Sequence, residues 1–170
     1  KKISVRDNGS GIHAAEIGLA IMEHATSKLG ADSALDCIST YGFRGEALSS
    51  IASISDFVIL SKRRDEERGA RLESLSGNVS VTDFMGSPGT TVIVENLFHN
   101  VPARKKFLKA KKTELRSIRE SLLRISLAAY GTAFTFEVDG KRQVTLPAAA
   151  KAEDRISQVF GRGIMDNLYF

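Results

Sequence analysis

The sequence has 170 residues, of which 42% are hydrophobic and 26% are charged, and its formal net charge is +4. This length suits one domain, or one domain and part of another, and the composition is typical of packed globular proteins. No apolar run is long enough for a membrane span, and we expect no secretory signal from the polar start. The single cysteine, Cys37, excludes an intrachain disulfide, and the three scattered histidines offer no metal-ligand spacing.

The first half of the chain predicts a strand, then helices, then a series of strands. A short strand over residues 3–5 is stopped by the strong turn formers of residues 7–11. Apolar residues at helical spacing predict a helix over residues 13–23, and residues 29–38 predict a loop and a short helix. A further helix is expected over residues 47–54. Apolar and β-branched runs predict strands over residues 57–60, 72–75, 79–84 and 90–95.

The second half predicts two helices around a hairpin. Pro102 is placed to open a helix, and residues 115–129 form a long amphipathic helix. Residues 134–138 and 143–146 predict two strands joined by a turn at Asp139 and Gly140. A last helix is expected over residues 152–160. The order of elements predicts an α+β fold, and because the chain starts without Met in an apparent strand, we expect a fragment of a longer protein.

The segment D-N-G-S-G-I, residues 7–12, has two interpretations that the residues alone leave open. It is a surface turn, or it places the Asp7 carboxylate at the end of a strand, where glycines let the backbone approach a flat ligand. A carboxylate accepts hydrogen bonds, which suits the exocyclic amine of adenine. A calcium loop is excluded, because the third, fifth and twelfth positions are Gly9, Gly11 and Gly18 rather than oxygen ligands.

Two further segments contain groups that suit phosphate. Thr26, Ser27 and Lys28 offer two hydroxyls and an ammonium, or they cap a helix end beside a solvated lysine. The segment G-F-R-G-E-A-L, residues 42–48, leads into a helix whose amide groups favour an anion, or it is a tight turn. Neither segment has the Walker or dinucleotide-binding pattern.

Two weaker signals lie further along the chain. Gly89 and Thr90 are typical of an ordinary strand start. The stretch from residue 104 to residue 112 holds six basic residues and no acidic residue, which indicates a solvated face more often than a nucleic-acid site.

Taken together, the order D-x-G-x-G, T-S-K, G-F-R-G-E-A-L and G-T resembles the GHKL ATPases. Within that superfamily, the strings DNGSGI, HATSKL, TYGFRGEALSSIASIS and NLFHNVPARKKFLK resemble the MutL family of DNA mismatch repair proteins. The resemblance covers nearly the whole chain. It implies a Bergerat α/β sandwich with a mixed sheet over residues 1–130, and the beginning of a ribosomal-S5-like second domain over residues 131–170.

The resemblance also implies residue roles. Asp7 would bind the adenine amine, with Gly11 and Thr90 shaping the base pocket, and residues 44–48 would form part of a lid and an amide cradle for phosphates. The nucleotide-binding residues that the resemblance implies are Asp7, Gly9, Gly11, Ile12, Thr26, Ser27, Lys28, Gly42, Phe43, Arg44, Gly45, Glu46, Ala47, Leu48 and Thr90. No metal ligand is expected among them, and the family's general base and its Mg²⁺-binding asparagine are expected upstream of Lys1.

The implied function is an ATP-switched dimeric clamp that links mismatch recognition to strand removal. Its cofactors would be ATP and Mg²⁺. Its partners would be DNA, contacted largely without sequence preference, a second copy or a paralogue, and a mismatch-recognition protein of MutS type, with no membrane. The intact protein would hydrolyse ATP in the bacterial cytoplasm, or in the nucleus of a eukaryote, whereas this chain without its general base would be inactive. Two alternatives stay open: another GHKL ATPase of chaperone or kinase type, and a non-enzymatic DNA-binding scaffold.

Overall fold

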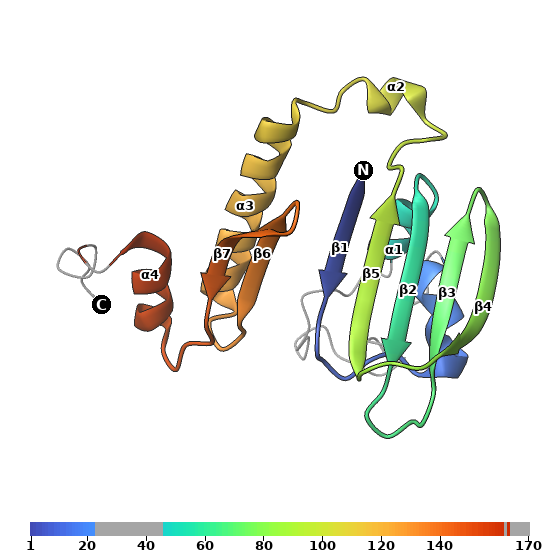
Figure 1. Cartoon of the computed structure of the whole chain (residues 1–170), viewed down its shortest axis with the longest axis horizontal. Helices are drawn as coiled ribbons and strands as arrows, with labels where there is room; N and C mark the ends of the chain where they lie inside the picture. Colours follow the sequence, from blue (N-terminus) through green and yellow to red (C-terminus); the bar gives the residue numbers. More distant parts are fainter. Residues whose placement is uncertain (23–45, 162, 164–170) are drawn as a thin grey trace, which may run out of the picture. The chain divides into compact units, whose positions relative to one another are not determined.

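The chain forms two compact units, Lys1–Phe107 and Leu108–Phe170 (Figure 1). The structure is a computed structural model, and it describes residues 1–22, 46–161 and 163. The helix predicted over residues 29–38 lies outside these residues. Within the described ranges, no helix is both long and apolar enough to cross a membrane. The expected module boundary at residues 130 and 131 stays a prediction.

A five-stranded sheet is the centre of the first unit. Its strands are β1 (Lys2–Arg6), β2 (Asp56–Lys62), β3 (Gly69–Leu75), β4 (Asn78–Phe84) and β5 (Gly89–Glu95), in the spatial order β1-β5-β2-β3-β4 (Figure 1). The predicted strands of this unit are therefore confirmed, each with bounds wider by one to three residues at one or both ends.

The sheet is antiparallel throughout, so the expectation of a mixed sheet is wrong for the described strands. Strand β1 and strand β2 run in the same direction, as a strand–helix–strand order suggests. They are not neighbours, however, because β5 enters between them and pairs antiparallel with both. Strands β2, β3 and β4 are joined by short connections, which link antiparallel neighbours.

Two helices cover one face of this sheet. The first, η1 (Ala14–Ile21), is a 3₁₀-helix, and the second is α1 (Ala47–Ala52). Ile17 of η1 and Ala52 of α1 join one apolar core with the inward-facing strand residues Phe57, Ile59, Ala70, Leu72 and Val94. The helix predicted over residues 13–23 is present, but apolar spacings of three and four did not distinguish the 3₁₀ form from the α form. The result is a two-layer α+β unit.

Helix α2 (Pro102–Lys105) closes the first unit, with Pro102 in its first turn as predicted. Before it, residues 96–101 fold back against the end of α1. The Phe98 N–H donates to the Ile54 carbonyl at 2.6 Å, and the Asn100 side-chain amide donates to the Ser53 carbonyl at 2.8 Å.

The second unit contains α3 (Lys111–Ala128), the hairpin of β6 (Phe134–Val138) and β7 (Lys141–Leu146), and α4 (Ala152–Phe160). Asp139 and Gly140 both have positive φ, 50° and 75°, as a two-residue hairpin turn requires. Arg155 of α4 is fully buried, with Nη2 within 2.9 Å of the carbonyl oxygens of Tyr130, Thr132 and Pro147. A buried guanidinium thus ties the helix to the two chain segments that flank the hairpin.

Candidate functional site

Three chain segments meet at one end of the five-stranded sheet. Residues 7–13 follow β1, Gly89 and Thr90 begin β5, and Ser61 lies near the end of β2. The pairing of the strands brings them together, because Arg6 lies opposite Thr91 and Ser61 lies opposite Thr90. Asp7, Gly11, Ile12 and Thr90, predicted from separate motifs, therefore lie at one place.

The Asp7 carboxylate is held by one of its two oxygens. Oδ1 accepts from the Gly9 N–H at 2.9 Å and from the Thr90 N–H at 3.2 Å, and the Asp7 N–H donates to the Thr90 carbonyl at 2.8 Å. Within the described part of the chain, Oδ2 has no hydrogen-bond partner, and the residue is exposed. The arrangement fixes the carboxylate while leaving one oxygen to accept a hydrogen bond from a ligand.

Two glycines allow the backbones to approach closely at this end. Gly11 has φ +76°, and a Cβ there would lie 2.1 Å from the Lys62 carbonyl oxygen. Gly89 has φ +116°, and a Cβ there would lie 2.3 Å from the Asp7 carbonyl oxygen. A side chain at either position would collide with backbone and would also strain φ. The loop can therefore lie against β2 and β5 only because these positions are glycine.

Ser61 is a member of this site that the motifs did not reveal. Its side chain is 0% exposed, and Oγ accepts from the Ile12 N–H at 2.8 Å. Oγ also lies 2.9 Å from the Thr90 hydroxyl and 3.2 Å from the Gly89 carbonyl oxygen. The signal that could have found it is the alternation along β2, which puts Ser61 on the same inward face as Phe57 and Ile59.

The connection between β2 and β3 holds the loop from a second direction. The His13 side chain accepts from the Ala15 N–H through Nδ1 at 3.2 Å, so its proton is on Nε2, which lies 3.2 Å from Glu66 Oε1. The Ala14 N–H is also directed to Glu66 Oε1, at 3.4 Å. Glu66 therefore ties the chain just after the glycine loop to the connection between the strands.

An exposed ion pair lies in the same connection. Arg63 donates to Asp65 through Nε at 2.9 Å and through Nη2 at 2.7 Å. This hydrogen bonding, together with the charge of the guanidinium, lowers the pKa of the Asp65 carboxyl below its ordinary value. Both side chains are exposed, so the pair contributes little to the folded state.

The predicted phosphate-binding residues divide into two groups. Glu46 precedes α1, Ala47 begins it, and Leu48 is half-buried against the apolar core. The remaining predicted residues lie outside the described residues: Thr26, Ser27, Lys28, Gly42, Phe43, Arg44 and Gly45. The amide cradle for phosphates stays a prediction.

The described residues do not supply a metal centre of their own. No group of three or more His, Cys, Asp or Glu side chains in the described ranges is placed to hold a metal ion. Magnesium prefers carboxylate ligands together with phosphate oxygens. The Mg²⁺ that the family resemblance implies stays a prediction.

The sequence is similar to bacterial DNA mismatch repair proteins. It is 49% identical over 127 residues to the DNA mismatch repair protein MutL of Xylella fastidiosa (strain M23), and 50% identical over 127 residues to that of Xanthomonas oryzae pv. oryzae (strain PXO99A). Each match covers 74% of the chain and 20% of the relative, so the chain spans about a fifth of the length of these curated relatives. No protein-family model matches the chain.

The fold is similar to solved MutL structures. The Aquifex aeolicus MutL ATPase domain complexed with ADP gives a TM-score of 0.74 at 28% identity, over 94% of this chain and 57% of that chain. The ATPase domain of the mismatch repair endonuclease MutL from the same organism gives a TM-score of 0.70 at 26% identity, over 93% of this chain and 53% of that chain.

Proposed function

The chain belongs to the MutL family of DNA mismatch repair proteins and corresponds to part of its ATPase domain, and on this premise we propose that the Asp7 end of the sheet binds the adenine base of ATP. The observation that carries the proposal is the Asp7 carboxylate, with Oδ1 held by two backbone N–H groups and Oδ2 left to a ligand. The ADP in the Aquifex aeolicus structure supports a nucleotide as the ligand.

The chemistry of adenine fits these groups. Its exocyclic amine donates hydrogen bonds and its ring nitrogen N1 accepts them, so the amine suits Asp7 Oδ2 and N1 suits a hydroxyl such as that of Thr90. Gly11 and Gly89 let the loop after β1 pack closely against β2 and β5, which brings Asp7 and Thr90 to one place. Guanine presents a carbonyl oxygen in place of the amine, which a carboxylate repels.

The rest of the nucleotide-binding proposal follows from the family. Gly9 and Ile12 would hold the loop, while Thr26, Ser27, Lys28 and residues 42–48 would contact the phosphates. The second unit would belong to an S5-like module beside a Bergerat sandwich. In the intact protein, ATP binding and hydrolysis would switch a dimeric clamp between open and closed states, because a ligand that prefers one state shifts the population toward it. Dimerisation, a MutS-type partner and a cytoplasmic location in bacteria belong to the same proposal.

Replacement of Asp7 by Asn tests adenine recognition directly. The Asn carbonyl oxygen can still accept from Gly9 and Thr90, so the loop keeps its shape, while the amide NH₂ now faces the adenine amine. We expect calorimetric titration of the intact protein to show ADP binding weakened by about 10- to 100-fold, as loss of a hydrogen bond to a charged group implies. The affinity for GDP should rise instead, because the guanine carbonyl oxygen then faces the NH₂ donor of the new amide.

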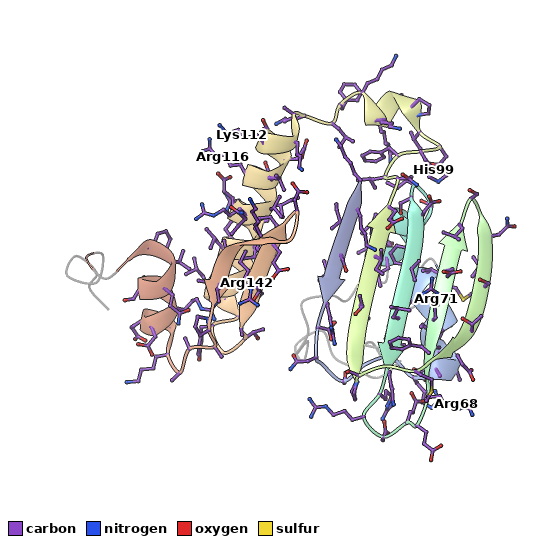
Figure 2. The ribbon with its side chains drawn as sticks, in the orientation of Figure 1. Arg68, Arg71, His99, Lys112, Arg116 and Arg142 are labelled. Atoms are coloured by element: carbon purple, nitrogen blue, oxygen red, sulfur yellow. The ribbon has the colours of Figure 1, made fainter. Side chains whose placement is uncertain are left out.

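The matched control is Asp83→Asn. Asp83 is an exposed aspartate on β4 that pairs with Arg68 at 2.9 Å, and both residues lie outside the Asp7 site. Figure 2 shows Arg68 on the connection between β2 and β3. Equal ADP affinity of the original protein and Asp7→Asn would contradict the proposal, as would equal losses in the two variants.

Non-specific DNA binding is a second proposed function, supported by the charge of α3. Lys112 and Arg116 project from its first turns (Figure 2), and Arg119 and Arg124 follow on the same helix. Two basic residues of the helix are already paired, Lys111 with Asp139 at 2.7 Å and Arg116 with Glu120 at 2.8 Å, which favours a weak contact with the phosphate backbone.

A salt series tests the DNA contact. If α3 neutralises phosphates, the logarithm of the association constant for a duplex of random sequence should fall linearly with the logarithm of the salt concentration. The double variant Lys112→Ala/Arg119→Ala should lower that slope by about one to two. An unchanged slope would remove α3 from the contact. Binding that depends strongly on duplex sequence would argue against backbone recognition.

A further inference from the structure

Ser61 is the one fully buried hydroxyl at the Asp7 end of the sheet among the described residues. It occupies an inward position of β2, after Phe57 and Ile59, where a hydrocarbon side chain is the ordinary choice. A buried hydroxyl is unfavourable unless its hydrogen bonds are made. Its partners therefore indicate why it is there.

These partners all come from the segments that form the proposed base site. Ser61 Oγ accepts from the Ile12 N–H at 2.8 Å, lies 2.9 Å from the Thr90 hydroxyl, and lies 3.2 Å from the Gly89 carbonyl oxygen. Ile12 ends the loop that carries Asp7. One side chain on β2 thus fastens both the loop after β1 and the beginning of β5.

The number of protons limits what these groups can do. A serine hydroxyl has one proton to donate and two lone pairs that accept, and an amide N–H can only donate. The Ile12 N–H therefore takes one lone pair of Ser61. The Ser61 proton then goes either to the Gly89 carbonyl or to the Thr90 hydroxyl.

The two choices leave Thr90 with opposite properties. If Ser61 donates to Gly89, the Thr90 proton completes the bond to Ser61, and Thr90 offers a ligand only lone pairs. If Ser61 donates to Thr90, the Thr90 proton is released to a ligand that accepts, as adenine N1 does. Both arrangements keep the hydrogen bond of 2.9 Å between Ser61 and Thr90, so in either one Ser61 holds the Thr90 hydroxyl in a fixed orientation.

We infer that Ser61 is a positioning residue that selects the base, because it holds the Thr90 hydroxyl in a fixed orientation and holds the Ile12 amide that ends the Asp7 loop. This inference rests on the proposed binding of adenine at Asp7. Ser61 does not touch the base. Without it, the Thr90 hydroxyl turns freely and the Asp7 loop loses its bond to β2, so discrimination between adenine and guanine narrows.

The experiment compares ADP with GDP in the intact protein by calorimetric titration. Ser61→Ala is expected to weaken ADP binding by about 10-fold and to narrow the ratio of the GDP and ADP dissociation constants by a similar factor, as loss of one buried hydrogen bond implies. Ser61→Cys fills nearly the same volume with a weak hydrogen-bonding group. It keeps the core packed if the alanine variant is too unstable, and it should narrow the ratio as well.

Ser55→Ala is the matched control. Ser55 immediately precedes β2 at the other end of the sheet, is 2% exposed, and donates to the Ile51 carbonyl at 2.7 Å. It should lower thermal stability about as much as Ser61→Ala while leaving both dissociation constants unchanged. A merely structural role of Ser61 would shift stability but not the ratio of the two constants.

The possible results distinguish a failure of the Ser61 role from a failure of adenine binding at Asp7. A narrowed ratio in the Ser61 variants but not in Ser55→Ala supports the inference. If the original protein prefers ADP to GDP and both Ser61 variants keep that preference, the inference is overturned while adenine binding stands. If the original protein shows no preference for ADP, adenine binding at Asp7 fails, and the inference fails with it.

Discussion

The two ends of the five-stranded sheet are fastened by different means. At the Asp7 end, a buried hydroxyl and two glycines bring three segments into contact, with a carboxylate oxygen left over. At the opposite end, exposed asparagine side chains hold the segment after β5 against α1 and the start of β2. Both ends contain a distinctive sequence motif, so the presence of a motif does not show which end binds a ligand.

At the opposite end, the polar side chains form hydrogen bonds with other groups of the protein. The Asn100 side-chain amide donates to the Ser53 carbonyl at 2.8 Å, and that of Asn96 donates to Asp56 Oδ2 at 2.7 Å. Asn96 and Phe98 have positive φ, 50° and 62°, a conformation that residues other than glycine adopt rarely and at some energetic cost. The hydrogen bonds stabilise this turn, and their donors are already used.

The two ends differ in whether their polar groups can still bind a ligand. At the asparagine end, the amide donors satisfy acceptors of the same chain, which is the arrangement of a structural fastening. At the Asp7 end, the backbone is satisfied while Asp7 Oδ2 and the Thr90 hydroxyl can still bind. The candidate site is distinguished by polar groups that can still bind a ligand, and not by its number of hydrogen bonds.

The largest expected effect tests the close approach at the Asp7 end. In Gly89→Ala the new Cβ would lie 2.3 Å from the Asp7 carbonyl oxygen at a φ of +116°. Backbone strain and overpacking together predict a loss of about 3–5 kcal/mol in the free energy of unfolding, measured with urea. ADP binding should weaken with it, because Asp7 is displaced.

Gly77→Ala is the matched control for the strain alone. Gly77 has φ +87° in the turn between β3 and β4, and no atom lies within 4 Å of a Cβ built there. Gly77→Ala should lower the free energy of unfolding by about 1–2 kcal/mol and leave ADP binding unchanged. Equal losses of unfolding free energy in the two variants would show that the close contact between Gly89 and the Asp7 backbone adds nothing to the cost of the substitution.

A smaller effect is expected at the asparagine end. Asn100→Ala removes the bond to the Ser53 carbonyl, which is exposed to water, so the free energy of unfolding should fall by about 1 kcal/mol. Affinity for ADP should not change. Asn78→Ala, at the exposed start of β4, is the control and should have almost no effect on stability.

This variant separates the two ends functionally. A loss of ADP affinity in Asn100→Ala, with the fold intact by circular dichroism, would contradict a purely structural role of Asn100. It would show that the asparagine end contributes to the site through α1 and is more than a fastening.

Much of this fold could be predicted from the chain. Periodicity located the strands and helices of the described residues, and Asp139-Gly140 identified the hairpin turn with its two positive φ values. The mixed sheet, which the family resemblance implied, was wrong for the described strands, because β5 lies between β1 and β2 and pairs antiparallel with both. Only the pairing of β5 with both β1 and β2 settles the order of the strands.

Only part of the candidate site could be predicted from the sequence, because some of its residues belong to no motif. Asp7, Gly11 and Thr90 were predicted because short motifs contain them. Ser61 was missed because it ends an apolar run and resembles a strand terminus, and its partners lie 28 to 49 residues away in the sequence. Arg155 was missed in the same way, since an arginine in an amphipathic helix normally projects into water. Its carbonyl partners are brought together only by the fold.

The smallest expected effect concerns the exposed ion pair at the Asp7 end. The hydrogen bonds from Arg63 lower the pKa of Asp65, so the ionised carboxylate is the form that the folded protein favours. The stabilisation is therefore present above the ordinary pKa of an aspartate and is lost as pH falls through the lowered value. In Arg63→Ala the pKa of Asp65 should rise toward its ordinary value in an NMR titration, while stability at neutral pH stays nearly unchanged.

Arg68→Ala is the control, because Arg68 pairs with Asp83 and should leave the titration of Asp65 unaltered. ADP affinity gives the sharper result. Arg63 and Asp65 lie in the same connection as Glu66, which contacts the chain just after the loop, yet both are exposed. If Arg63→Ala weakened ADP binding as much as Ser61→Ala, proximity to the loop would matter more than burial. An unchanged affinity would show that a position near the loop does not by itself make a side chain part of the binding site.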